Sequence, residues 1–181
     1  MKNILIILGT IIVGGVIYIG YMLANPVSPK DGVVFKSDNA KLEVIYSRPY
    51  KKGRLIFGEE KDGALVPYGK YWRTGANAAS TFETSSKIVF GNTKLKAGKY
   101  RLYTVPSKSS WKVVLNSDSD KFFAISEPDY SKDVLEVKIT PELSEKEVEQ
   151  FTVDFYKGEN GIFMRLLWDK TIVAIPIKTR D

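Results

Sequence analysis

Short runs in which apolar and polar residues alternate fill the chain from about Val33 to Lys178. Seven such runs, rich in β-branched and aromatic side chains, cover residues 41–47, 99–105, 111–116, 133–139, 150–156, 162–168 and 171–178. A period of two is typical of strands with one buried face, and turn residues separate these runs at the spacing usual in all-β folds. We therefore predict an all-β domain, either an antiparallel β-sandwich or a partly open barrel.

Two local signals refine this prediction. Pro176 has no N–H to donate to a neighbouring strand, so we predict that the last strand lies at a sheet edge. Thr140 can cap a helix whose first residue is Pro141, which predicts a helical turn or two before Gln150.

The first 24 residues follow a different pattern. Ile4–Ala24 is a run of 21 mostly apolar residues, and no charged side chain lies between Lys2 and Lys30. As a helix this run would be about 31 Å long, close to the thickness of a bilayer hydrocarbon core. Met22 stands where a signal peptidase site needs a small residue, so we predict an uncleaved transmembrane helix in preference to a cleaved signal peptide.

The resulting organisation has three parts. Residues 1–24 form the membrane anchor, residues 25–32 a proline-containing linker, and residues 33–181 an exported β-domain. Lys2 on the short flank favours a cytoplasmic N-terminus. We therefore expect a single-pass membrane protein whose C-terminal domain is periplasmic or otherwise extracytoplasmic.

Composition narrows the available chemistry. The chain has no cysteine and no histidine, which excludes thiolate nucleophiles, disulfides, imidazole-based triads and metal sites that use either residue. Oxygen ligands spaced as in a calcium loop occur between Asn116 and Glu127, but Lys121 occupies the position that requires glycine. We predict a polar hairpin turn there, no metal site and no cofactor.

Positive charge and aromatic rings concentrate in one stretch. Tyr46–Gly75 carries seven basic side chains and three acidic ones, a local net charge of +4, with aromatic residues interleaved. Guanidinium forks and ring faces can bind a flat or anionic ligand. The candidate ligand-binding residues are Arg48, Lys52, Arg54, Lys70, Trp72, Arg73 and Asn77. A structural alternative is that arginine stems cover aromatic rings, while residues 127–160, with a net charge of −6, offset the basic stretch.

The strings YSRPYKKGRLIFG, LVPYGKYWRTGANAAS, LKAGKYRLYTVP and WKVVLN occur in this order along the chain. Together they resemble the bacterial domain-of-unknown-function 2911 family over roughly Val33 to Lys178. The resemblance implies an exported or membrane-anchored bacterial domain and assigns it no activity.

These features favour binding over catalysis. We predict a module that binds an anionic or glycan-like envelope ligand, with the bilayer as a further partner. Export argues against nucleic acid despite a pI near 9.3. Two alternatives stay open: a structural or assembly protein of the cell envelope, and a hydrolase without histidine that uses a Ser47–Lys70 pair or two carboxylates.

Overall fold

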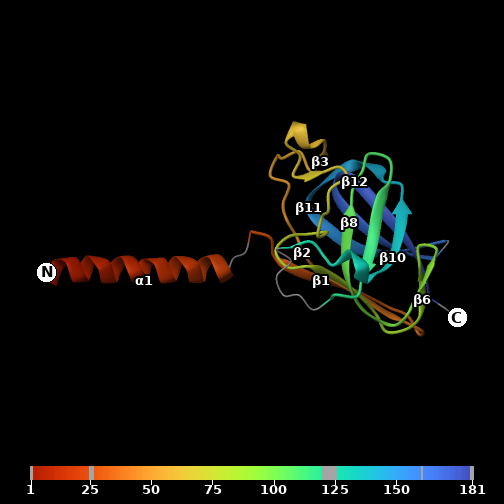
Figure 1. Cartoon of the computed structure of the whole chain (residues 1–181), viewed down its shortest axis with the longest axis horizontal. Helices are drawn as coiled ribbons and strands as arrows, with labels where there is room; N and C mark the ends of the chain where they lie inside the picture. The colour runs from red at the N-terminus through yellow and green to blue at the C-terminus, as the bar shows by residue number, and fades with distance from the viewer. Residues whose placement is uncertain (1, 25–26, 120–125, 160, 180–181) are drawn as a thin grey trace.

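One helix is followed by a β-rich domain (Figure 1). The computed structural model describes residues 2–24, 27–119, 126–159 and 161–179. The helix is α1 (Lys2–Ala24), and two short 3₁₀ turns are η1 (Glu60–Asp62) and η2 (Tyr130–Lys132). The strands are β1 (Lys30–Lys36), β2 (Lys41–Ser47), β3 (Phe57–Gly58), β4 (Val66–Pro67), β5 (Ser80–Thr84), β6 (Ile88–Phe90), β7 (Thr93–Leu95), β8 (Gly98–Val105), β9 (Trp111–Asn116), β10 (Asp133–Ile139), β11 (Glu142–Gly158) and β12 (Gly161–Thr179).

The strands form two antiparallel sheets and one small parallel pair. The larger sheet has the order β1-β2-β5-β8-β9-β10, and the smaller has the order β11-β12-β6-β7. Strands β3 and β4 pair in parallel at one end of the domain. The predicted class, a mostly β fold built from antiparallel sheets, is confirmed.

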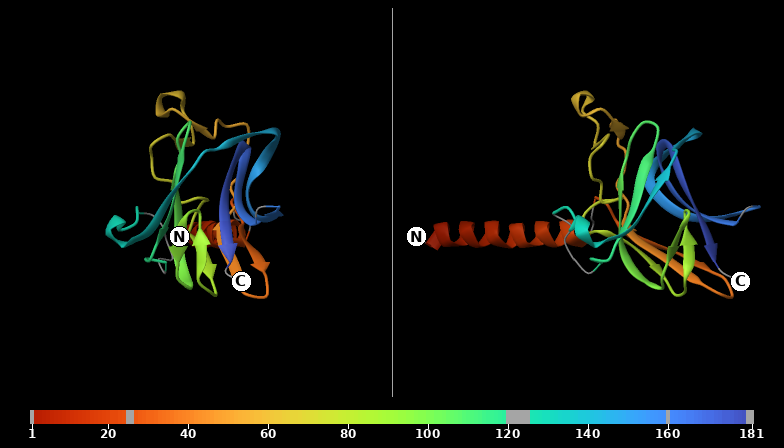
Figure 2. Two further views of the ribbon diagram at one scale, coloured as in Figure 1. Left: turned by 90° about the vertical axis from the view of Figure 1, so that its right-hand side faces the viewer. Right: turned by 45° about the vertical axis from the view of Figure 1, so that its right-hand side comes forward.

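The two sheets lie against each other (Figure 2), and the alternation seen in the sequence places one face of each in a common core. In β2, Leu42 and Val44 are fully buried, and in β9 Val113 and Leu115 are fully buried, while Lys112, between Trp111 and Val113, is exposed. The smaller sheet contributes Phe90, Met164 and Ile175 among others to the same apolar cluster. The two sheets therefore share one core, as the sheets of a β-sandwich do.

Aromatic rings fill the end of this core nearest β3. Trp72, Trp111 and Trp168 surround Phe57, whose ring centroid lies 4.8 Å from that of Trp111. Trp72 and Trp168 stack with centroids 5.7 Å apart and an interplanar angle of 20°. The backbone of Trp72 is held on β8, because its N–H donates to the Thr104 carbonyl and its own carbonyl accepts from the Thr104 N–H.

The segment expected to begin a helix is a strand. β11 starts at Glu142, which pairs with Ile172 of β12, so the predicted helical turn between Thr140 and Gln150 is wrong. The cap signal of Thr140 and Pro141 is local, whereas pairing with β12 supplies backbone partners along the segment. Tertiary pairing thus overrides a weak local preference.

The two final runs form one strand, β12, and not two. Asp169, read as part of a turn, has a φ of 54° inside β12, where the register against β11 shifts. The prediction that Pro176 marks an edge strand is also wrong, because β12 lies between β11 and β6. Ile172 is the last β12 residue with a registered partner in β11. Pro176 comes after it, near the end of the strand, where its missing N–H removes no registered pair with β11.

The N-terminal helix extends away from the sheets (Figure 1). Its described side chains are exposed, including those of Ile11 and Ile17. Within the described part of the chain, no helix offers a stretch both long and apolar enough to cross a membrane. At the other side of the linker, β1 already begins at Lys30, which pairs with Ser47, so the strand includes the last three positions of the expected linker.

Candidate functional site

A cavity of about 300 Å³ opens where the linker meets the loops after β2 and β4. We call it the linker cavity. Its described lining residues are Val27, Ser28, Pro49, Tyr50, Lys52, Arg54, Leu65, Val66, Trp72, Gly75, Ala76 and Trp168. Its volume is at the lower end of the range for small-molecule sites, roughly 300–1,000 Å³.

The indole rings of Trp72 and Trp168 give the cavity a rigid wall. Trp72 is only 8% exposed, and its Nε1 donates to the Gly75 carbonyl at 3.1 Å. Gly75 has a φ of 144°, and a Cβ there would lie 2.8 Å from the Ser47 carbonyl oxygen. The loop can therefore approach β2 this closely only with glycine at position 75, which fixes the indole beside the cavity.

Two cations line the same cavity without a carboxylate partner. Arg54 donates from Nε to the Lys51 carbonyl at 2.9 Å and from Nη2 to the Tyr50 carbonyl, which leaves Nη1 available. Lys52 has a φ of 48° and donates its backbone N–H to Glu149. Among the described residues, neither side chain forms an ion pair.

The neighbouring Lys51 shows the opposite arrangement. Its Nζ lies 2.7 Å from Asp169 and 2.8 Å from Glu147, and these hydrogen bonds raise the pKa of Lys51. Acidic residues near the chain's end thus neutralise one lysine of the basic stretch. Lys52 and Arg54 have no such carboxylate partner among the described residues, so their charges give the linker cavity a positive potential.

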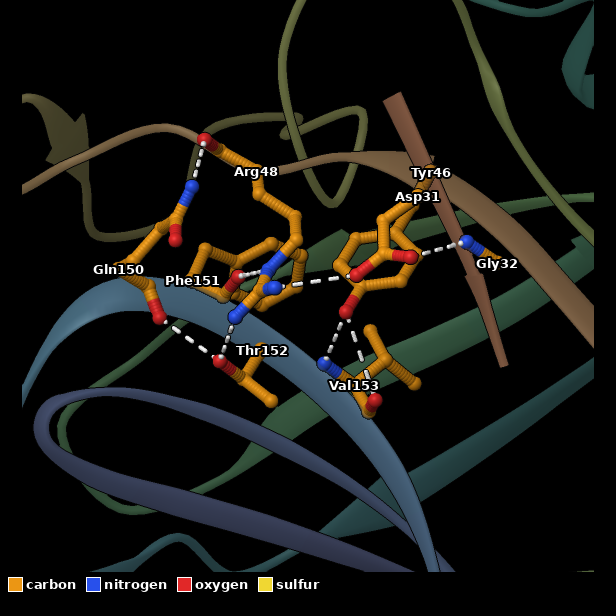
Figure 3. A network of polar contacts seen from close by, with 8 residues as sticks. All are labelled: Asp31, Gly32, Tyr46, Arg48, Gln150, Phe151, Thr152 and Val153. Atoms are coloured by element: carbon orange, nitrogen blue, oxygen red, sulfur yellow. Dashed lines mark hydrogen bonds and ion pairs between the residues drawn. The ribbon is translucent and has the colours of Figure 1, made fainter. Parts of the chain in front are cut away.

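Arg48 lies outside the linker cavity, at the junction of the two sheets (Figure 3). Its Nη1 is 3.0 Å from Asp31, its Nη2 donates to Thr152 at 2.8 Å, and its Nε donates to the Phe151 carbonyl at 3.1 Å. Gln150 in turn donates to the Arg48 carbonyl. The guanidinium therefore ties the end of β2 to β1 and β11.

Tyr46 makes a second tie between the same strands (Figure 3). Its hydroxyl accepts from the Val153 N–H at 2.9 Å and lies 3.4 Å from the Val153 carbonyl. Burial is the main cause that raises the pKa of this phenol. Together Tyr46 and Arg48 lock the two sheets at the end where the linker enters.

The other candidate residues are distributed around the linker cavity. Lys70 lines a separate cavity and lies 3.4 Å from Glu60. Arg73 donates to the Asn77 carbonyl at 2.9 Å, and Asn77 donates to the Ser28 carbonyl at 3.1 Å. These last two bonds hold the Gly75–Ala76 loop against the linker. Of the seven candidates, Lys52, Arg54 and Trp72 line the linker cavity.

Several lining residues were not candidates from the sequence. Trp168 comes from β12, almost a hundred positions after Trp72. Val27 and Ser28 belong to the linker, where nothing in the local pattern indicates a site. Only the packing of β12 and of the linker against the basic stretch brings these residues together.

The geometry does not bring Ser47 and Lys70 together, and the linker cavity offers no carboxylate pair. Ser47 is buried, whereas Lys70 is exposed and lines a different cavity, and the described lining of the linker cavity contains no carboxylate. Over the described residues, no group of three acidic side chains could hold a metal ion. The calcium-like spacing runs through residues 120–125, which lie outside the described ranges.

A comparison with protein families matches residues 28–177 to the family described as "Protein of unknown function (DUF2911)". The match covers most of the chain, so this protein belongs to that family. Neither the curated proteins nor the solved structures contain a match to the chain.

Proposed function

We propose that this chain is a membrane-anchored, extracytoplasmic binding module, and that its linker cavity takes a phosphate or carboxylate group of an envelope lipid or glycan. The observation that carries this proposal is the pair of cations, Lys52 and Arg54, beside the indoles of Trp72 and Trp168. A guanidinium presents paired N–H donors to such anions, and the aromatic wall lowers the local dielectric around them.

The anchor is inferred from the sequence of residues 1–24 as a whole and from the exposure of α1, whereas the finding that no helix could cross a membrane applies to the described part of the chain. No charged side chain lies between Lys2 and Lys30, and the helix has 23 residues, or about 35 Å of length. Ile12 and Ile17 are each about two-thirds exposed. A surface this apolar calls for a lipid or protein environment.

The anchor places the cavity close to the bilayer surface. Val27 and Ser28, which line the cavity, follow α1 after two residues. A short tether of this kind keeps the cations near lipid headgroups and the polymers attached to them. The same position suits a protein that samples ligands at the outer face of a membrane.

A thermal-shift measurement on the full chain in lauryldimethylamine oxide micelles tests the binding proposal. Inorganic phosphate, citrate or glucuronate should raise the melting temperature, because a ligand that binds only the folded state stabilises it. The Lys52→Gln and Arg54→Gln variants should lose this shift. The Lys99→Gln variant, altered at an exposed lysine outside the cavity, should keep it. Equal shifts in all variants, or none in the parent, would refute the proposal.

Cell fractionation tests the anchor. The protein should remain with the membrane fraction after a high-salt wash, and mass spectrometry should find residues 1–24 intact. A soluble mature chain that starts near Asn25 would contradict the anchor without deciding the question of the cavity.

A further inference from the structure

A second cavity, of about 390 Å³, lies on the outer face of the larger sheet. We call it the tyrosine cavity. Its floor and walls include Tyr71, Tyr103 and Tyr130, and its rim carries Lys112, Glu127 and Asp133. It shares no described lining residue with the linker cavity, so its role is independent of the function proposed above.

Strand alternation explains why these side chains face outward. Leu102 in β8 and Val113 in β9 point into the core, so Tyr103 and Lys112, one position away, point to the opposite face. On a free sheet face a tyrosine would be partly exposed. Here Tyr103 is 3% exposed, because Tyr71 and Tyr130 cover it.

The three rings form a floor with two flanks. The centroid of Tyr103 lies 5.4 Å from that of Tyr71 and 6.0 Å from that of Tyr130. Tyr130 remains 49% exposed and so is accessible to a ligand. Aromatic rings of this kind offer apolar faces on which the C–H face of a pyranose ring can pack, with polar atoms at their edges.

The hydroxyl groups of the tyrosines have defined hydrogen-bond roles. Tyr103 donates to Asp133 at 2.7 Å, and Tyr130 donates to Glu127, so both oxygens keep lone pairs for a donor. The Tyr71 hydroxyl instead accepts from Arg101 at 2.6 Å, which leaves its proton for an acceptor. The cavity therefore presents both donors and acceptors beside an aromatic floor.

Arg101 acts as a positioning residue for Tyr71. Its side chain is fully buried, its guanidinium lies 5.7 Å from the Tyr71 ring centroid, and it also donates to the Ser126 carbonyl at 3.0 Å. Among the described residues it has no carboxylate partner, and burial of such a cation costs stability. The bond from the buried guanidinium fixes the orientation of the Tyr71 hydroxyl.

The charges around the tyrosine cavity are mixed, unlike those of the linker cavity. Its lining contains two lysines and three carboxylates, namely Lys70, Lys112, Glu127, Asp133 and Glu136. The Nζ of Lys112 lies 3.5 Å from Glu136. A phosphate would meet three carboxylates here and be repelled. A neutral polyhydroxyl molecule, which both donates and accepts hydrogen bonds, matches the whole set.

From this combination we infer that the tyrosine cavity is a binding site for a neutral saccharide unit, packed on the accessible ring of Tyr130 and hydrogen-bonded by Tyr71, Glu127 and Asp133. An envelope glycan that carries both neutral and anionic groups would be able to engage the two cavities separately. Each cavity, however, is expected to bind its own probe alone.

Saturation-transfer NMR on the full chain in lauryldimethylamine oxide micelles tests this inference. The detergent has no sugar headgroup, so the probes are the neutral disaccharides chitobiose, cellobiose, maltose and lactose. At least one should receive saturation from the protein, and its pyranose C–H protons should receive the most. Tyr130→Ala should weaken its binding about tenfold, as loss of one aromatic contact implies.

Two further variants serve as controls, and a third is a second test of the site. Tyr156→Ala removes a tyrosine of similar exposure outside both cavities and should leave disaccharide binding unchanged. Lys52→Gln should also leave it unchanged, which separates this site from the linker cavity. Glu127→Gln, at an exposed position, should weaken binding and gives a second reading if Tyr130→Ala does not fold.

Three results would overturn the inference. The first is that none of the four disaccharides receives saturation. The second is that Tyr130→Ala and Glu127→Gln, both folded, bind as well as the parent. The third is that inorganic phosphate displaces the disaccharide from the parent protein.

Discussion

Arg48 and Arg54 come from the same basic stretch but have different roles. The Arg48 guanidinium is engaged by Asp31, Phe151 and Thr152. Among the described residues, Arg54 bonds only to nearby backbone carbonyls, and it faces the linker cavity. The sequence indicates that cations and rings gather here, and it includes Lys52, Arg54 and Trp72 in the candidate set. Whether an arginine is bound by acceptors within the protein depends on the position of β11. The local sequence pattern contains no information on the position of that strand.

Replacement of Arg48 measures its structural role. Arg48→Ala should lower the free energy of unfolding by about 2–3 kcal/mol, because it leaves the half-exposed Asp31 carboxylate and two acceptors on β11 without their hydrogen-bond donor. Arg73→Ala, which removes one exposed bond to the Asn77 carbonyl, should change it by less than about 0.5 kcal/mol. Urea unfolding followed by tryptophan fluorescence makes the comparison. Equal effects of the two substitutions would contradict the assignment.

The phenols of the tyrosine cavity predict an alkaline loss of stability. Burial and the hydrogen bond to Glu127 raise the pKa of Tyr130 to about 12, and burial followed by the bond to Asp133 raises that of Tyr103 further. Unfolded tyrosines ionise near about 10. Above that pH the unfolded state loses protons that the folded state keeps, so stability should fall as pH rises.

Ultraviolet absorbance of tyrosinate separates this effect from that of lysines with raised pKa values. In the folded protein, part of the tyrosine signal should titrate only above about 10, and Tyr130→Phe should remove one such component. Ionisation of all tyrosines together near the ordinary value would contradict the hydrogen-bonded arrangement.

At the level of elements, the sequence predicts some strands well and others poorly. β2, β9 and β10 have the predicted bounds, because each is rich in β-branched or apolar residues and pairs with a neighbour along most of its length. β11 was in part assigned to a helix, since its exposed first half carries Glu, Ser and Lys residues in place of an apolar alternation. A strand of this kind is determined by its partner, β12, more than by its own composition.

Short elements escaped prediction for a related reason. β6 (Ile88–Phe90) and β7 (Thr93–Leu95) are too short for a period of two to be recognised. Their turn contains Gly91 at a φ of 62°, beside Val137 of β10. This contact brings the smaller sheet against the edge strand of the larger one.

Two glycine substitutions test that contact. Gly63→Ala places a Cβ at a φ of 73° with no atom within 4 Å, so it should cost about 1–2 kcal/mol of unfolding free energy from backbone strain alone. In Gly91→Ala the Cβ would also lie 2.6 Å from Val137 Cγ1, which should add about 1–3 kcal/mol. Thermal or urea unfolding of the two variants measures the difference. No difference between them would mean that Gly91 does not pack against β10.

The whole molecule consists of the helix α1, a short linker and a β-domain whose cavities differ in charge. The linker is not a passive spacer, because Ser28 accepts a bond from Asn77 and Asp31 pairs with Arg48. The sequence divides the chain at Val33, and the structure assigns Lys30–Gly32 to β1. The β-domain thus depends on residues close to α1.

Truncation tests this dependence. A chain that begins at Val27 should fold as a soluble all-β unit with a cooperative melt and a β-type circular dichroism spectrum. A chain that begins at Val33 lacks three pairs of β1 with β2 and the Asp31–Arg48 ion pair, and should be less stable by about 2 kcal/mol. A mainly helical spectrum would contradict the fold, and equal stability of the two chains would contradict the role of the linker.

The central claim is that the linker cavity binds an anion through Lys52 and Arg54 beside Trp72 and Trp168. The most direct measurement is a titration of the isotope-labelled full chain with inorganic phosphate, in lauryldimethylamine oxide micelles, followed by ¹H–¹⁵N NMR. The account predicts saturable shifts concentrated on the amides of Lys52, Arg54 and Ala76 and on the indole N–H signals. Shifts spread evenly over exposed lysines, or confined to the tyrosine cavity, would contradict it.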